Sequence, residues 1–137
     1  DISDLLKMFW ECHDPTQKNR QGNDCGTQYR SAIYYVNENH LTKILNSQIQ
    51  YQILLEENNL GKIQTEIKYI DNYYFAEDYH QQYLAVQGSR QYCSASPTKL
   101  TLDYFKGSEF KLDKKIWGNF NWEIDKCVLR STNDPIK

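Results

Sequence analysis

The chain has 137 residues, of which 39% are hydrophobic and 14% aromatic, and its formal net charge is −2. This length fits one domain, and the composition excludes a highly charged, aromatic-poor disordered chain. The charge gives no basic footprint for nucleic acid, and no apolar run is long enough to span a bilayer. Because the sequence shows no apolar region of a signal peptide, we expect a cytoplasmic protein.

A helix, a polar loop and a strand are predicted first along the chain. The helix is expected to begin with Ser3 as its N-cap and to end before Pro15. Residues 16–26 are polar with two glycines and predict a loop. Residues 27–36 are rich in β-branched and aromatic side chains and predict a strand. The first helix is predicted because Leu5, Leu6, Phe9 and Trp10 recur at helical spacing and so form one apolar face.

A long helix, a second strand and a short helix are predicted next. The long helix covers residues 39–62, with Leu41, Ile44 and Leu45 on one side and Gly61 as its C-terminal stop. Alternation predicts a strand over residues 63–70, and residues 75–86 predict a short helix. Two strands do not make a stable sheet alone, so we expect the tail or sequence outside this chain to complete it. We divide the chain into a core, 1–86, and a tail, 87–137.

Asp24 and Tyr29 are the first candidate site residues. A carboxylate near a tyrosine can orient the phenol, which can then donate a hydrogen bond to a substrate oxygen. From spacing alone, an Asx-type turn at Asp24 and a core position for Tyr29 are the more common structures. Arg30 should point to the opposite face of the strand, where an ion pair is its simplest role.

Glu77 and His80 have the i, i+3 spacing of a di-iron ligand pair on a helix. That site needs two such pairs and two further glutamates, and the sequence has one pair, so we expect no metal. A partly buried His80 that ties its helix to a loop is the favoured interpretation, with a general base as the alternative.

The four cysteines are widely spaced and lack a C-x-x-C pair, which argues against a structural zinc site. We expect Cys12 and Cys25 to be reduced thiols. Cys93 and Cys127 lie in the tail, and a thiol on a mobile segment can reach another sulfur and form a disulfide. For Cys127, a small apolar residue in a short strand is an equal alternative.

Two strings resemble the methionine sulfoxide reductase A family closely. They are LLKMFWECHDPTQKNRQGNDCGTQYRSAIYY at 5–35 and AEDYHQQYL at 76–84. The family shows F-W-x-x-H-D-P-T, then Q-G-N-D-x-G-T-Q-Y-R-S-x-I-Y, and later A-E-D-Y-H-Q-x-Y-L. The resemblance covers about residues 1–84. It implies an α+β fold, a two-layer sandwich with a mixed sheet that is ferredoxin-like in character, followed by a long irregular C-terminal tail.

The resemblance also implies an oxidoreductase that repairs oxidised proteins by reducing methionine-S-sulfoxide, free or in proteins. A cysteine thiolate attacks the sulfur and becomes a sulfenic acid, a recycling cysteine forms a disulfide with it, and thioredoxin or dithiothreitol reduces that disulfide. No other cofactor is implied. On this basis Tyr29 binds the sulfoxide oxygen and Asp24 orients the polar network, while Cys93 is the recycling thiol and Cys127 a second candidate.

The sequence departs from the family at the nucleophile. The family's nucleophile lies in a Gly-Cys-Phe-Trp segment near the N-terminus, and no cysteine here is followed by Phe-Trp. We therefore expect the nucleophile upstream of Asp1 and expect this chain alone to be inactive. The alternatives are a truncated, non-catalytic paralogue or binding remnant, and a thiol protein in which Cys93 and Cys127 form a structural or regulatory disulfide.

Overall fold

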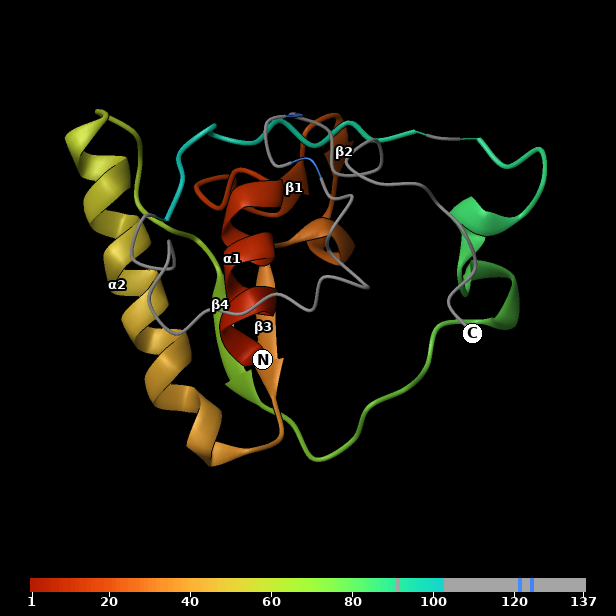
Figure 1. Ribbon diagram of the computed structural model, residues 1–137, viewed down its shortest axis with the longest axis horizontal. Coiled ribbons are helices and arrows are strands. Elements are labelled where there is room, and N and C mark those ends of the chain that lie inside the picture. Colours follow the sequence, from red (N-terminus) through yellow and green to blue (C-terminus); the bar gives the residue numbers. More distant parts are fainter. Residues whose placement is uncertain (91, 103–120, 122–123, 125–137) are drawn as a thin grey trace.

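The computed structural model describes residues 1–90, 92–102, 121 and 124 and shows a mixed α/β arrangement (Figure 1). In these residues two α-helices accompany two small two-stranded sheets. The elements are α1 (Ile2–Cys12), β1 (Arg20–Gln21), β2 (Asp24–Cys25), β3 (Ala32–Tyr35), α2 (Leu41–Glu57) and β4 (Glu66–Tyr69), with 3₁₀ helices at Thr27–Tyr29, Glu38–His40, Asp78–His80 and Tyr83–Ala85.

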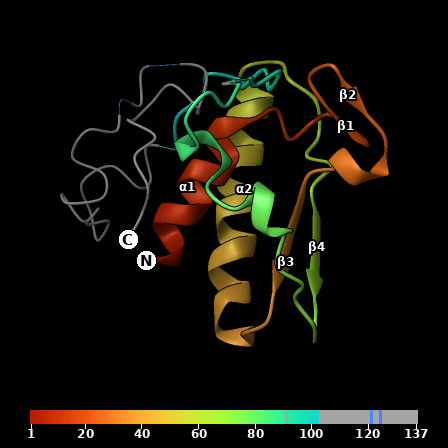
Figure 2. The ribbon, with the colours of Figure 1, turned by 90° about the vertical axis from the view of Figure 1, so that its right-hand side faces the viewer.

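Strands β3 and β4 form a parallel pair, with Ala32 opposite Glu66 and Tyr35 opposite Tyr69. Parallel neighbours need a crossover connection, and α2 supplies it. Both helices lie on one face of this sheet (Figure 2). Ile33 on β3 packs against the apolar cluster between the helices and the sheet. The two predicted strands therefore form the sheet against which the helix pair packs.

The core is centred on the contact between α1 and α2. The Trp10 indole is fully buried and stacks on Tyr51, with ring centroids 5.6 Å apart. Its Nε1–H donates to Ser47 Oγ at 2.9 Å, and Ser47 in turn donates to the Ile44 carbonyl at 2.7 Å. The buried apolar cluster contains Leu6, Trp10, Ile44, Tyr51, Leu55 and Leu102.

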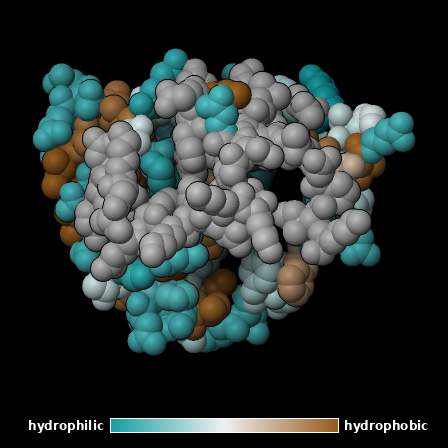
Figure 3. Space-filling view, in the orientation of Figure 1, coloured by the Kyte–Doolittle hydropathy of each residue, from teal (hydrophilic) through white to brown (hydrophobic). Residues whose placement is uncertain are grey.

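Helix α2 also carries apolar residues on its outer side. Leu45, Ile49 and Ile53 are 40%, 55% and 44% exposed, and apolar side chains lie between hydrophilic ones along the edge of the molecule that α2 forms (Figure 3). Ile44 faces the core whereas Leu45 does not, so the prediction that they share the buried side is wrong.

The helix boundaries differ from two of the predicted caps. The N-cap of α1 is Asp1 instead of Ser3, because the Asp1 carboxylate accepts from the Ser3 backbone N–H at 3.1 Å. Helix α2 ends at Glu57, and the left-handed residue that follows is Asn59, with φ of 57°, so Gly61 is not its stop. The predicted end of α1 before Pro15 is confirmed, since α1 ends at Cys12.

The strand and helix expected on either side of α2 are shorter in the structure. The predicted strand 27–36 begins as a 3₁₀ helix, Thr27–Tyr29; the backbone is extended from Arg30, and β3 itself begins at Ala32. The predicted helix 75–86 forms two 3₁₀ turns instead, because Gln82 between them adopts a left-handed conformation with φ of 48°. Leu84 and Ala85 are partly buried, and the other residues of this segment are exposed.

Residues 92–102, called the strap below, cross the molecule from the β1–β2 hairpin to the helices (Figure 1). The Thr98 hydroxyl lies 2.6 Å from the Tyr51 hydroxyl on α2. The Leu102 backbone N–H donates to the Glu11 carboxylate on α1 at 2.8 Å, and the Leu102 side chain is buried in the core. Within the described part of the chain, no helix is long and apolar enough to cross a membrane.

Candidate functional site

The loop predicted before the first strand contains a short hairpin. Strands β1 and β2 pair antiparallel around Gly22 and Asn23. The Arg20 guanidinium donates to the Gly22 carbonyl at 2.7 Å, and the Gly22 N–H donates to the Gln17 side chain at 2.9 Å. These bonds satisfy both backbone groups of Gly22. The Gly-Asn pair between two polar dipeptides is the sequence signal for this hairpin, whereas residues 16–26 were predicted to form a loop without strands.

Tyr29 ends the 3₁₀ helix that follows the hairpin, and its backbone N–H donates to the Gly26 carbonyl at 3.0 Å. The Tyr29 side chain is 42% exposed, so it is not the core residue that spacing alone favours. Among the described residues, no hydrogen bond joins the Tyr29 hydroxyl to another side chain. The phenol is therefore free to donate to a ligand.

Asp24 on β2 is half-buried, and its carboxylate accepts from the Ser94 hydroxyl of the strap at 3.2 Å. The hairpin contacts the 3₁₀ helix that ends at Tyr29. Within the described residues, however, no hydrogen bond joins Asp24 to Tyr29. The structure thus places the two candidates on adjacent elements and gives Asp24 a partner from the tail that the sequence did not suggest.

Arg30 has the ion pair predicted for it. Its Nε lies 3.4 Å from a Glu66 carboxylate oxygen, and both side chains are half-exposed. Its Nη2 donates to the Tyr34 hydroxyl at 3.1 Å, so Arg30 joins β3 to β4 at the surface. The sulfoxide site assigned by resemblance does not require it.

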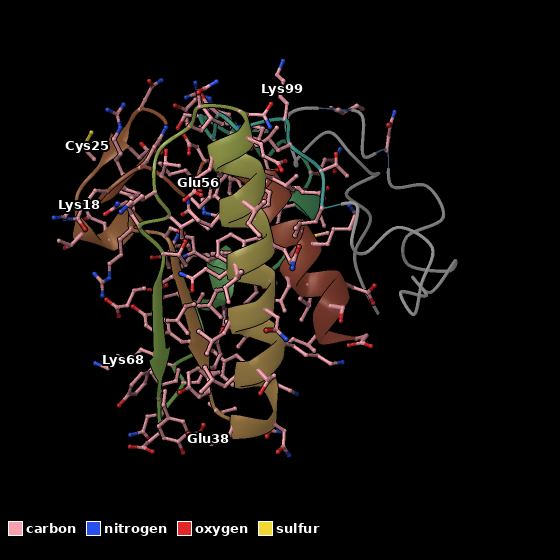
Figure 4. All side chains as sticks on the ribbon, turned by 90° about the vertical axis from the view of Figure 1, so that its left-hand side faces the viewer. Lys18, Cys25, Glu38, Glu56, Lys68 and Lys99 are labelled. Carbon is pink, nitrogen blue, oxygen red and sulfur yellow. The ribbon has the colours of Figure 1, made fainter. Side chains whose placement is uncertain are left out.

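The described cysteines are in two states. Cys25 is a free, exposed thiol on the hairpin (Figure 4). Cys93 is a free thiol that lies half-buried on the strap. Cys12 is disulfide-bonded, so the prediction of a reduced thiol there is wrong. Cys127 lies outside the described residues, and its predicted recycling role stays a prediction.

Glu77 and His80 form an exposed pair, with His80 Nδ1 2.9 Å from the Glu77 carboxylate. The Glu77 backbone N–H and then His80 lower the pKa of this carboxyl. His80 is 57% exposed, so the prediction of a partly buried histidine is wrong. Within the described residues, no group of three or more His, Cys, Asp or Glu side chains lies close enough together to hold a metal ion.

His13 is a buried polar residue that the sequence reasoning missed. Its Nδ1 lies 2.7 Å from the Phe9 carbonyl, which only accepts, so Nδ1 carries the proton. Nε2 of the neutral ring then accepts from the Ser31 hydroxyl at 2.8 Å, and Ser31 lies 2.8 Å from the Thr65 hydroxyl. This network ties the end of α1 to the segment between Tyr29 and β3. The residue type at the helix end, a histidine before Asp-Pro, was the available signal.

We expect stability to fall as pH falls below the ordinary pKa of histidine, because burial lowers the pKa of His13 from 6.5. The unfolded chain then binds the proton first, so the free energy of unfolding decreases from about pH 6.5 down to the folded-state pKa. Urea unfolding at about pH 7.5 and about pH 5 measures this difference. His13→Gln should make this difference in the free energy of unfolding smaller. A difference in His13→Gln as large as that in the unmodified chain would contradict the role of His13.

Comparison with known proteins decides the family. A family model described as "Peptide methionine sulfoxide reductase" matches residues 1–112. The chain belongs to the peptide methionine sulfoxide reductase family.

Members of the reductase family from distant organisms are similar to this chain. The Peptide methionine sulfoxide reductase MsrA of Salinispora arenicola is 52% identical over 99 residues, which are 72% of this chain and 45% of the relative. The human mitochondrial peptide methionine sulfoxide reductase is 50% identical over 97 residues, which are 71% of this chain and 41% of the relative.

A solved reductase structure is also similar to this chain. The solved structure of methionine sulfoxide reductase A of Corynebacterium diphtheriae superposes with a TM-score of 0.58 at 41% identity, covering 71% of this chain and 49% of that protein. The chain therefore spans somewhat less than half the length of the reductases it matches.

Proposed function

We propose that this chain carries one wall of a site that reduces methionine-S-sulfoxide, in oxidised proteins or as the free amino acid. The observation that carries the proposal is the Tyr29 hydroxyl, exposed and without a partner among the described residues, in a chain of the reductase family. An unpaired phenol can donate to the sulfoxide oxygen and stabilise the negative charge that grows on it as the S–O bond breaks. Asp24 then orients the polar network around that oxygen.

The thiol chemistry of the proposal uses Cys93. Cys93 is free and lies next to Ser94, which is hydrogen-bonded to Asp24. A free thiol beside the substrate wall is suited to attack the sulfenic acid that forms on the nucleophile, which yields a disulfide and water. Thioredoxin, or dithiothreitol in the test tube, would then reduce that disulfide. The nucleophile itself is assigned to a Gly-Cys-Phe-Trp segment that these 137 residues do not contain.

The proposal also concerns the sheet to which β3 and β4 belong. We infer that the β3–α2–β4 unit belongs to a larger two-layer sandwich with a mixed, ferredoxin-like sheet, since a two-stranded sheet is marginal alone. Residues 1–86 form the reductase-like core in this view, and residues 87–137 form the tail. A cytoplasmic location stays a prediction, because the similar reductases include mitochondrial ones.

A hybrid protein tests the proposed function. In it, the part of the Corynebacterium diphtheriae reductase that precedes the matched region is joined to Asp1 of this chain. We expect the hybrid to convert dabsyl-methionine-S-sulfoxide to dabsyl-methionine with dithiothreitol and to leave the R epimer unchanged. A folded hybrid with its Gly-Cys-Phe-Trp segment intact but without product would favour a non-catalytic paralogue instead.

A further inference from the structure

The strap contacts the hairpin through Ser94. The Ser94 hydroxyl lies 3.2 Å from the Asp24 carboxylate and 3.4 Å from the Gln21 carbonyl, so its single hydrogen is shared between two acceptors. All three residues are partly buried. Both contacts are longer than the usual hydroxyl hydrogen bond, and partial burial limits competition by water for them.

Gly22 makes the same contact possible from the hairpin side. A Cβ built on Gly22 would lie 1.7 Å from the Ser94 carbonyl oxygen and 2.5 Å from its carbonyl carbon. Real atoms do not approach so closely, so any other residue at this position pushes the strap away. Gly22 also adopts a left-handed conformation, with φ of +57°, which glycine tolerates best.

The rest of the strap is anchored on the helices and not on the hairpin. Thr98 bonds to Tyr51 on α2, and Leu102 bonds to Glu11 on α1. At the start of the strap, where Cys93 lies, the hydrogen bonds between described residues that reach the rest of the fold are those from Ser94 to the hairpin. Cys93 is free and only half-buried, so small reagents can report on how firmly this end is held.

We propose that Ser94 and Gly22 form a latch that holds Cys93 against the hairpin beside Asp24. Ser94 is a positioning residue: it supplies the hydrogen bond, and Gly22 supplies the space for it. With the latch closed, the Cys93 thiol stays at the wall that carries Asp24 and Tyr29; with the latch open, the segment before Thr98 swings freely. That Cys93 recycles the nucleophile rests on the proposed function, whereas the latch itself does not.

Alkylation of the two free thiols tests the hydrogen-bonded half of the latch. The chain is treated with iodoacetamide, and the rates at Cys93 and Cys25 are measured separately by peptide mass spectrometry, with exposed Cys25 as the internal reference. Ser94→Ala should raise the Cys93 rate by roughly three- to tenfold, which is the range expected from losing one hydrogen bond. Ser94→Thr keeps a hydroxyl and should restore the slow rate. Ser89→Ala, which removes only a local bond to the Leu84 carbonyl, should change nothing.

Two glycines provide the matched test of the steric half. Gly22→Ala should raise the Cys93 rate as Ser94→Ala does. Gly88→Ala introduces an alanine at a similar backbone strain, with φ of +80°, but a Cβ there has no neighbour within 4 Å, so the Cys93 rate should stay low. Urea unfolding of each variant separates local opening of the strap from loss of global stability.

The latch is wrong if Ser94→Ala and Gly22→Ala leave the Cys93 rate unchanged, or if they raise the Cys93 and Cys25 rates equally. Neither outcome depends on turnover. The alkylation rates therefore test the latch even if the hybrid reductase is inactive. An active hybrid would not support the latch if the alkylation rates contradict it.

Discussion

Tyr29→Phe is expected to lower kcat of the hybrid reductase by about a hundredfold, the loss typical when one donor to a developing oxyanion is removed. The substitution deletes only the hydroxyl, and the exposed ring keeps its place at the end of the 3₁₀ helix Thr27–Tyr29. Because the donor bonds more strongly to the oxygen as charge develops, kcat should fall more than KM rises. Steady-state rates of dabsyl-methionine formation measure both constants.

Tyr34→Phe is the control for that substitution. Tyr34 is exposed to a similar degree, 44% against 42%, and lies close by on β3. Its hydroxyl already accepts from Arg30, whereas the Tyr29 hydroxyl has no such partner in the part of the chain that the structure describes. The control should retain nearly the activity of the unmodified hybrid. Equal losses in both variants would show that the effect comes from the sheet edge and not from a donor to the substrate.

Trp10→Ala is expected to destabilise the chain by about 3–5 kcal/mol, the usual cost of removing a buried large aromatic side chain. The indole is fully buried, stacks on Tyr51 and donates to Ser47, so the substitution removes packing and a hydrogen bond together. The free energy of unfolding in urea measures the loss. Trp10→Phe keeps most of the ring and should cost less, which gives a measurable value if the alanine variant does not fold.

Leu5→Ala serves as the comparison for Trp10. It lies on the same helix but is 61% exposed, so its free energy of unfolding should change by no more than about 0.5 kcal/mol. A loss at Leu5 comparable with that at Trp10 would mean that α1 packs through a different face from the one in the structure.

The fold could be predicted where apolar periodicity is strong. The spacing of apolar residues in α1 and α2 and the alternation around β4 gave these elements with the correct type, because burial against a common core produces those patterns. The ends of the helices were less predictable. Asp1 competes with Ser3 for the same N-cap, and Asn59 takes the left-handed position that a glycine usually occupies. Such choices depend on small differences in free energy between neighbouring residues that could each end the helix.

The site was predictable in its residue types and not in its contacts. Asp24 and Tyr29 could be named from local sequence and family resemblance. The strap could not, because Ser94 meets Asp24 across 70 positions of sequence, and weak periodicity after residue 87 gave no sign that Leu102 enters the core. The buried bonds of His13 were hidden for the same reason, since Ser31 and Thr65 come from separate elements.

The central claim is that this chain holds the substrate wall and Cys93 but not the nucleophile, and one assay tests it most directly. The 137-residue chain and the hybrid reductase are incubated side by side with dabsyl-methionine-S-sulfoxide and dithiothreitol. We predict dabsyl-methionine from the hybrid and none from the chain alone. Product from the chain alone that disappears when Cys25 or Cys93 is replaced by serine would contradict the claim, because the nucleophile would then be one of these thiols.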